Sequence, residues 1–274
     1  MDIRDTAVSA AREAGGMLRE KLGRAGTIEF KGAVDLVTEM DRRAEELIVS
    51  RIRKVFPDHG ILTEESEERV SASGCRWVID PLDGTTNYAH GFPVFCVSIA
   101  FEDPEGLLFG VVYDPMLDET FTAERGGGAY LNGERIRVSK TETLDRSLLA
   151  TGFPYDVRTS ERNNLDHFAE FAVRAQAIRR AGSAALDLAY VAAGRFDGFW
   201  EMKLRPWDVA AAGLMVSEAG GSIKDMDGGP FSSATADVLA SNGLIEGEMN
   251  EVLGRPGVPC RGAPHRGTPR AGRP

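Results

Sequence analysis

The sequence predicts a mixed α/β fold, and three observations support that prediction. Two N-terminal segments place apolar residues at the three- and four-residue spacing of an amphipathic helix. Short runs of β-branched and aromatic residues bounded by turn formers follow them, as expected for strands. The chain has 274 residues, of which 42% are hydrophobic, so it can bury a full core in one domain or in two closely packed halves.

The first half is expected to contain two helices followed by a run of strands. The helices are expected over residues 5–22 and 41–56, where Pro57 stops the second one. Asn132-Gly133 is typical of the tight turn that joins two antiparallel strands. Strands are expected at residues 60–63, 76–80, 94–101, 107–113 and 119–124.

The second half alternates strands and helices and contains no internal repeat. Ser183 is expected to open a helix that Gly194 closes. Asp208 is expected to be the N-cap or a first-turn residue of a helix ended by Gly220-Gly221. The remaining expected elements are strands near 147–151, 176–179, 196–201, 222–225 and 237–240 and helices near 161–174 and 243–253.

The strongest functional signal lies in residues 77–91, Trp-Val-Ile-Asp-Pro-Leu-Asp-Gly-Thr-Thr-Asn-Tyr-Ala-His-Gly. Its first residues predict the end of a buried strand, which Asp80 closes and Pro81 stops. Asp80 and Asp83 offer hard oxygen ligands, which suit Mg²⁺. The backbone N–H groups of residues 84–86 would face an anion if they open a helix. A structural alternative remains, because Asp-Pro and Asp-Gly are common turn formers.

Two further acidic positions strengthen the functional interpretation. Glu64, followed by Glu65, ends a short apolar run, and Asp208 stands at the expected start of a helix. Helix capping remains the alternative role for Asp208. Two unit charges about 4 Å apart repel by roughly 4 kcal/mol at an effective dielectric near 20, so gathering these acids beside Asp80 and Asp83 would require cations. The residues alone do not establish that the four side chains converge.

The chain resembles the inositol monophosphatase family of Mg²⁺-dependent, lithium-sensitive phosphatases. Residues 80–87, Asp-Pro-Leu-Asp-Gly-Thr-Thr-Asn, match the first motif of that family, and residues 207–221, Trp-Asp-Val-Ala-Ala-Ala-Gly-Leu-Met-Val-Ser-Glu-Ala-Gly-Gly, match the second. The match covers about residues 1–253, and Thr63 departs from the Gly that relatives often carry there. The resemblance implies alternating helix and mixed-sheet layers and one catalytic domain over residues 1–254. The site would lie between two sub-regions that meet near residue 145.

The resemblance implies two or three Mg²⁺ ions. Glu64, Asp80 and the carbonyl oxygen of Leu82 would bind the first ion. Asp80, Asp83 and Asp208 would bind the second, and a third, looser ion would be held by Glu64 through water. These ions would neutralise the phosphate, lower the pKa of the attacking water and shield the leaving oxygen, so no covalent phospho-enzyme is required.

Catalytic roles follow from the same resemblance. Thr85 and Glu64 would help to hold and deprotonate the attacking water, and Asp41 would orient Thr85 as a proton relay. A helix N-cap is the alternative role for Asp41. The backbone of Gly84, Thr85 and Thr86 would hold the phosphate oxygens.

A separate set of residues is expected to select the substrate. Gly182, Ser183 and Ala184 precede a helix and could offer N–H groups and a hydroxyl group to a sugar-like ring. Glu201 matches the position at which family members accept hydrogen bonds from inositol hydroxyls, and a surface Glu at a strand end is the alternative. Because buried acceptors are costly when unpaired, Glu201 and Asp208 favour a substrate rich in hydroxyl groups.

The expected substrate is therefore a small phosphorylated polyol, first of all myo-inositol monophosphate. Histidinol phosphate, fructose 1,6-bisphosphate and adenosine 3′,5′-bisphosphate are the alternatives within the superfamily. An alternative of another class is a regulator that binds a protein or a ribonucleoprotein. The resemblance also implies a homodimer.

Composition limits the partners and the compartment. The net charge is −10, although residues 255–274 contain five arginines and no acid and are expected to form a disordered Arg/Gly/Pro-rich tail. An acidic body makes nucleic acid an unlikely main partner. The chain shows no apolar run long enough to span a membrane and no secretory signal, which predicts a cytoplasmic protein. Its cysteines, Cys75, Cys96 and Cys260, are expected to be reduced thiols.

Overall fold

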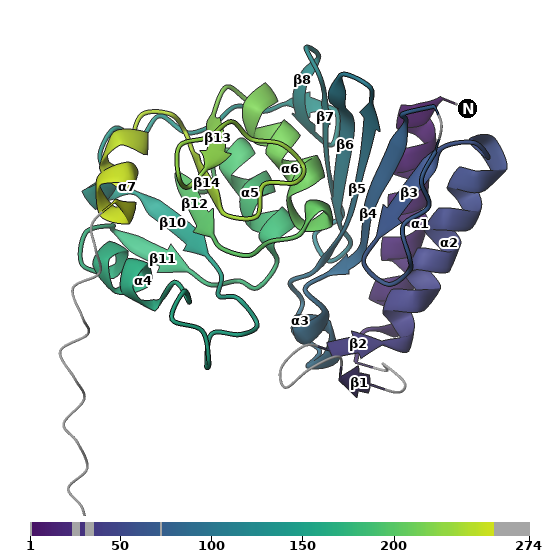
Figure 1. Cartoon of the computed structure of the whole chain (residues 1–274), viewed down its shortest axis with the longest axis horizontal. Helices are drawn as coiled ribbons and strands as arrows, with labels where there is room; N and C mark the ends of the chain where they lie inside the picture. Colours follow the sequence, from purple (N-terminus) through teal and green to yellow (C-terminus); the bar gives the residue numbers. More distant parts are fainter. Residues whose placement is uncertain (1, 24–27, 31–35, 72, 255–274) are drawn as a thin grey trace, which may run out of the picture.

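The computed structural model describes residues 2–23, 28–30, 36–71 and 73–254. Helices and sheets alternate in five layers, with one pair of helices between two sheets and a pair on each outer face (Figure 1). This confirms the mixed α/β, layered fold. The helices are α1 (Ile3–Lys21), α2 (Glu39–Val55), α3 (Thr85–Ala89), α4 (Leu165–Ala172), α5 (Ala184–Ala192), α6 (Pro206–Glu218) and α7 (Glu246–Leu253).

The larger sheet has the strand order β3-β4-β5-β6-β7-β8-β9. The pair β3–β4 is parallel and every following pair is antiparallel. The expected hairpin turn is present, with Asn132 at φ 49° and Gly133 at φ 85°. The strands are β3 (Gly60–Thr63), β4 (Arg76–Asp83), β5 (Cys96–Asp103), β6 (Gly106–Asp114), β7 (Glu119–Glu124), β8 (Gly128–Leu131) and β9 (Glu134–Arg135).

The smaller sheet has the strand order β11-β10-β12-β14-β13. Its strands are β10 (Leu148–Thr151), β11 (Ala177–Arg179), β12 (Gly198–Glu201), β13 (Ser222–Asp225) and β14 (Val238–Ser241). Strand β10 is parallel to both of its neighbours, whereas β14 is antiparallel to β12 and β13. A third, two-stranded sheet of β1 (Ile28–Phe30) and β2 (Leu36–Thr38) was not expected from the sequence. The chain passes from the larger to the smaller sheet between residues 135 and 148.

Strand β4 does not end at Asp80, as the sequence suggested, but continues through Pro81 to Asp83. Its pairing with β5 goes from Asp80↔Ser98 to Asp83↔Cys96, so β4 uses one residue more than β5 between these pairs. This is a β-bulge, and it accommodates the missing N–H of Pro81. Because Ser98 and Cys96 are two residues apart and share one face of β5, their partners Asp80 and Asp83 also share a face.

Two helices are shorter than expected for a conformational reason. Asn164 has φ 72° and Gly243 has φ 83°, and a right-handed helix cannot pass through a left-handed residue. Helix α4 therefore begins only after Asn164, whose side-chain amide donates hydrogen bonds to the hydroxyl oxygen of Thr151 and the carbonyl oxygen of Gly152. Helix α7 likewise begins beyond Gly243, at Glu246.

Some expectations fall outside the part of the chain that is described. The disorder expected over residues 255–274 and the thiol of Cys260 lie there. Of the helices that are described, none combines the length and the apolar character needed to cross a lipid bilayer.

The middle helix α6 packs with its backbone directly on the larger sheet. Val209 and the seven residues after it are buried, and the helix contacts β5, β6 and β7. A Cβ atom on Gly110 of β6 would lie 2.8 Å from the carbonyl oxygen and 2.9 Å from the Cα atom of Ala211. Only glycine permits this approach, which fixes the height of α6 over the sheet.

Replacing Gly110 with Ala is expected to lower the free energy of unfolding by about 1–3 kcal/mol, because the new methyl group overlaps backbone atoms that cannot rotate away. Thermal denaturation followed by circular dichroism measures the loss. Gly16→Ala in α1 is the control, because a Cβ atom there meets nothing within 4 Å and Ala favours the helix. Equal melting temperatures for the two variants would contradict the close-contact argument.

Candidate active site

A cavity of about 550 Å³ lies where the carboxyl end of β4 faces the start of α5, the end of β12 and the start of α6. Both sheets contribute to its wall. Every residue expected from the sequence to bind metal or substrate lines this cavity: Glu64, Asp80, Leu82, Asp83, Gly84, Thr85, Thr86, Gly182, Ser183, Ala184, Glu201 and Asp208. The structure therefore brings together side chains that are up to 144 positions apart in the chain.

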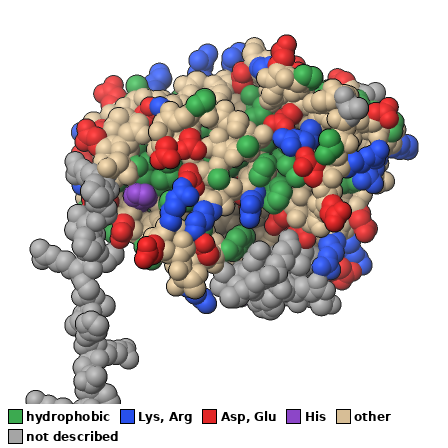
Figure 2. Space-filling view, viewed as in Figure 1, with side chains coloured by type: hydrophobic (Ala, Val, Ile, Leu, Met, Phe, Trp, Pro, Cys, Tyr) green, Lys and Arg blue, Asp and Glu red, His purple; other side chains and the backbone are tan. Residues whose placement is uncertain are grey.

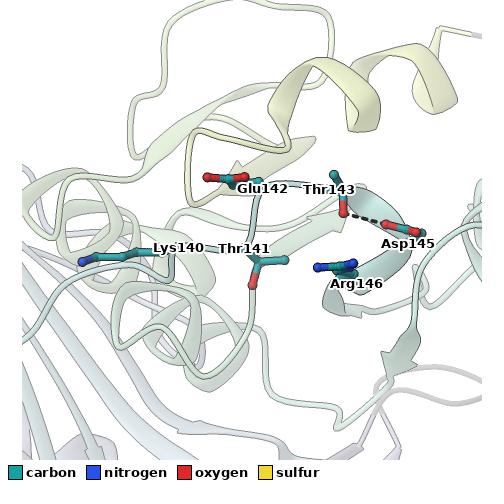
Figure 3. Close-up of a pocket in the computed structure, with 6 residues that line it drawn as sticks. All are labelled: Lys140, Thr141, Glu142, Thr143, Asp145 and Arg146. Atoms are coloured by element: carbon teal, nitrogen blue, oxygen red, sulfur yellow. Dashed lines mark hydrogen bonds between the residues drawn. The ribbon is translucent and has the colours of Figure 1, made fainter.

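A larger hollow of about 660 Å³ is not a comparable site. It is lined by one stretch of chain, residues 140–146, whose side chains point in different directions (Figure 3). The hydroxyl group of Thr143 donates a hydrogen bond to Asp145 within that stretch. Because no second element contributes to its wall, this hollow is the space beside a loop.

Asp83 is held firmly by the start of α5. Its Oδ2 atom accepts hydrogen bonds from the hydroxyl group of Ser183 (2.6 Å) and the backbone N–H of Ala185 (2.8 Å). The thiol of Cys96 lies 3.8 Å from the same oxygen. The hydroxyl proton of Ser183 is thus directed to Asp83, because a carboxylate is the stronger acceptor. The hydroxyl oxygen of Ser183 can still accept a hydrogen bond, so its contact with a ring hydroxyl of the substrate stays a prediction.

Asp80 and Asp208 likewise each accept a hydrogen bond from a backbone N–H group through one carboxylate oxygen. The Oδ1 atom of Asp80 accepts from the N–H of Leu82 at 2.9 Å, and the Oδ2 atom of Asp208 accepts from the N–H of Arg205 at 2.7 Å. The N-cap of α6 is Arg205, and Asp208 is a first-turn residue that completes a capping box with it. Capping and a site role are therefore compatible for Asp208, since capping occupies a single oxygen.

The electrostatics of this group are unfavourable unless its charge is compensated. Burial and the charges of Glu64, Asp83 and Asp208 raise the pKa of Asp80 well above its usual value. Burial and the charge of Asp83 raise the pKa of Asp208 in the same way. Carboxylates that repel one another at this depth need protons or cations to remain there.

The donor set fits Mg²⁺ in its chemistry. Protein donors occupy one oxygen of each of Asp80, Asp83 and Asp208, which leaves the second oxygen of each carboxylate for a hard cation. Within the ranges that the structure covers, no three Asp, Glu, His or Cys side chains already converge on one point as they would around a bound ion. Binding of an ion would therefore require these side chains to turn toward one another.

Thr85 and Asp41 are in direct contact. The hydroxyl oxygen of Thr85 lies 3.0 Å from Oδ1 of Asp41 and 3.0 Å from the carbonyl oxygen of Leu82. Its single proton can serve only one of these acceptors at a time, so its lone pairs face any third partner as acceptors. The N-cap alternative for Asp41 is wrong, because α2 begins at Glu39 and Asp41 is buried in its first turn.

Glu201 is the last residue of β12 and faces the cavity, so it is not the surface residue of the alternative interpretation. Burial raises its pKa to about 8, against a lowering contribution from Arg180 and a raising one from Asp83. Gly152 makes room for its carboxylate, since a Cβ atom there would lie 2.1 Å from Oε1 of Glu201. The position of Glu201 thus depends on a residue that sequence reasoning had not singled out.

The comparison with known families decides the identity of this site. The model of the inositol monophosphatase family matches residues 2–255. The chain belongs to the inositol monophosphatase family. Membership makes it a phosphatase of a family that is generally metal-dependent, in agreement with the acidic, oxygen-rich cavity.

Relatives and solved structures agree with this assignment. The chain is 42% identical over 252 residues to the inositol-1-monophosphatase of Mesorhizobium japonicum, covering 91% of this chain and 95% of the relative. It is 47% identical over 239 residues to the Nus factor SuhB of Escherichia coli, covering 86% and 90%. The structure of the extragenic suppressor protein suhB from Bartonella henselae matches with a TM-score of 0.86 and 42% identity, over 92% of this chain and 98% of that chain.

A second cavity residue of this inositol monophosphatase family member, besides Gly152, was not singled out in the sequence. Asp187 of α5 lines the cavity and is 1% exposed. Its signal was present, because it is the only charged residue of α5, Ala-Ala-Leu-Asp-Leu-Ala-Tyr-Val-Ala. A single acid on an otherwise apolar helix needs an explanation.

The face of the molecule shown in Figure 2 has no large patch of charged side chains of a single sign. Lys and Arg side chains are interspersed there with Asp and Glu side chains. A continuous basic surface, which is the usual footprint of a nucleic-acid-binding protein, is not seen on this face.

Proposed function

We propose that the chain hydrolyses a small polyol phosphate, with myo-inositol monophosphate as the main substrate, in a reaction that depends on Mg²⁺. The observation that carries this proposal is the single cavity in which Asp80, Asp83 and Asp208 each keep an oxygen for a cation beside the acceptor Glu201. Glu64 and the carbonyl oxygen of Leu82 complete the ligand set that we assign. The number of ions, two or three, belongs to the same proposal.

When bound there, Mg²⁺ would neutralise phosphate charge and make a water molecule more acidic. The protein's own part is to position and deprotonate that water. The hydroxyl oxygen of Thr85 would accept a proton from the water while the hydroxyl proton of Thr85 passes to the buried carboxylate of Asp41, 3.0 Å away, whose negative charge it neutralises. Glu64, which lines the same wall, would serve as the second acceptor for the water.

The phosphate group would be held by the chain that follows β4. Gly84, Thr85 and Thr86 line the cavity, and Gly84 is in the left-handed conformation (φ 98°) at the start of α3. Backbone N–H groups in such a turn can be directed at an anion. The ring hydroxyls would then extend toward residues 182–184 and Glu201, which line the same cavity.

A panel of phosphate esters tests this function. Initial rates of phosphate release with Mg²⁺ should be highest for inositol monophosphates and lower for histidinol phosphate, fructose 1,6-bisphosphate and adenosine 3′,5′-bisphosphate. Lithium should inhibit the reaction. A higher kcat/KM for one of the other esters would show that this ester, and not inositol monophosphate, is the preferred substrate. The proposal that the chain is a phosphatase would still hold.

Glu201→Gln should lower kcat/KM for inositol 1-phosphate by about tenfold or more, because an acceptor for ring hydroxyls is weakened while metal and phosphate binding is kept. The rate with 4-nitrophenyl phosphate, which has no ring hydroxyls, should fall much less. Steady-state kinetics with both esters measure the difference. Equal losses with both esters would remove Glu201 from substrate selection.

A second function has one observation in its favour, the 47% identity with the Nus factor SuhB of Escherichia coli. We propose that a role as a Nus factor would not require phosphate release by this chain. Asp83→Asn should therefore restore growth of an Escherichia coli strain lacking that factor as well as the unmodified chain does. Failure of both chains to restore growth would contradict the proposal that this chain can replace the Escherichia coli factor.

The chain is further proposed to act as a homodimer in the cytoplasm. Light scattering coupled to size-exclusion chromatography would give the mass of the particle in solution. A mass of 29.6 kDa, that of one chain, would contradict the dimer.

A further inference from the structure

Asp187 is a buried acid with one side-chain oxygen that makes no hydrogen bond in the described part of the chain. Its Oδ1 atom is fully buried and has no hydrogen-bond partner among the described residues. The other members of α5 that are buried with it are apolar, so the helix itself offers no donor to this atom. A buried polar atom without a partner is destabilising, and such atoms are rare in folded proteins.

The surroundings of Asp187 connect it with substrate selection. Asp187 and Glu201 line the same cavity, and the charge of Glu201 acts on Asp187 together with those of Asp83 and Arg180. Asp83 belongs to the metal-binding wall, whereas Glu201 belongs to the wall assigned to the substrate ring. Arg180, whose charge lowers the pKa of Asp187, makes no hydrogen bond to the Oδ1 atom of Asp187 in the described structure.

We propose that Asp187 is a second specificity-determining residue, whose carboxyl group hydrogen-bonds to a ring hydroxyl of a cyclic polyol phosphate next to the hydroxyl that Glu201 binds. This inference rests on the proposed phosphatase function and names the part of the substrate that the site recognises. The substrate would carry two neighbouring hydroxyl groups on the side of the ring away from the phosphate.

Hydroxyl groups fit this position better than a charged amine does. A hydroxyl group both donates and accepts, so it can pair with Asp187 whether or not that carboxyl group carries a proton. An ammonium group would lie near the guanidinium group of Arg180, whose like charge opposes it.

The test compares inositol 1-phosphate with cyclohexyl phosphate, which has the same six-membered ring and no ring hydroxyls. For Asp187→Leu, the ratio of kcat/KM for inositol 1-phosphate to kcat/KM for cyclohexyl phosphate is expected to fall about tenfold, the effect of losing one hydrogen bond. Asp187→Asn, which retains a polar group of the same shape, should recover part of the ratio. A merely structural acid would not change this ratio.

Thermal stability gives an independent readout in the absence of ligands. Because Asp187 has an unpaired buried oxygen, Asp187→Leu should raise the melting temperature, whereas a structural role predicts a fall. Asp114→Asn is the control: Asp114 is also buried but accepts hydrogen bonds from Met116, Leu117 and Tyr190, so its replacement should leave the ratio unchanged.

The role of Asp187 and the polyol phosphatase function on which it rests can fail independently in these assays. If the unmodified enzyme does not prefer inositol 1-phosphate to cyclohexyl phosphate, the proposed polyol phosphatase function fails. If it does and Asp187→Leu shows the same preference, the inference about Asp187 fails. If Asp187→Leu loses activity toward 2-aminoethyl phosphate and keeps its activity toward inositol 1-phosphate, Asp187 recognises an amine, and the assignment of Asp187 to a ring hydroxyl is wrong.

Discussion

Asp83→Asn is expected to lower kcat for inositol 1-phosphate by about 100- to 1000-fold while the fold is retained. The substitution removes one negative charge from the proposed cation-binding wall, and loss of such a ligand costs several kcal/mol of transition-state stabilisation, with about 1.4 kcal/mol for each factor of ten. The Asn side chain has nearly the same shape. Its amide oxygen can still accept from Ser183 and Ala185, so α5 stays in place.

Initial-rate assays over a range of Mg²⁺ concentrations, together with thermal denaturation, test this prediction. The melting temperature without metal should stay the same or rise, because a buried charge is removed. Asp114→Asn, outside the cavity, is the control for replacing a buried acid. Near-normal turnover of Asp83→Asn at low Mg²⁺ would contradict the ligand role of Asp83.

The metal-free protein is expected to lose stability as the pH rises from about 5 to 8, and Mg²⁺ is expected to restore it. The pKa of Glu201 is raised from 4.5 to about 8, and burial and mutual repulsion also raise those of Asp80 and Asp208. A carboxyl group with a raised pKa binds its proton more tightly in the folded state. Its stabilisation is therefore complete below the unfolded pKa and is lost as the pH rises through the folded pKa.

A single pKa unit corresponds to about 1.4 kcal/mol, and about 1 kcal/mol shifts the melting temperature of a chain of this size by roughly 2 °C. The melting temperature in EDTA should thus fall by several degrees between pH 5 and pH 8. Saturating Mg²⁺ should raise it more at pH 8 than at pH 6, because a cation binds the ionised carboxylates. Glu201→Gln should flatten the EDTA curve, and a curve that rises with pH would contradict the assignment of buried, mutually repelling acids.

Most of the fold could be predicted from the sequence because its elements carry local signals. Hydrophobic periodicity identified α1 and α2 to within two residues at either end. The bulge in β4 could not be predicted, since it depends on which residues of β5 pair with Asp80 and Asp83. The late starts of α4 and α7 depend on left-handed residues that a hydrophobic pattern does not reveal.

The candidate site was predictable where a residue belongs to a contiguous motif. Asp80, Asp83 and Asp208 were found in this way, and the structure places all three on one cavity. Asp187 and Gly152 were missed for a common physical reason. Their importance lies in what surrounds them, an unpaired buried oxygen in one case and a neighbouring carboxylate in the other, and neither is visible along the chain.

Because both sheets contribute to the wall of the cavity, cleavage of the chain between them would divide the site. A cut within residues 140–146, where the chain has left the larger sheet, would put Asp80 and Asp83 on one fragment and Glu201 and Asp208 on the other. Neither fragment alone would contain all of the proposed metal-binding and substrate-binding side chains. Mixed at low concentration, the two would give a rate proportional to the product of their concentrations, so that catalysis itself would report their complementation.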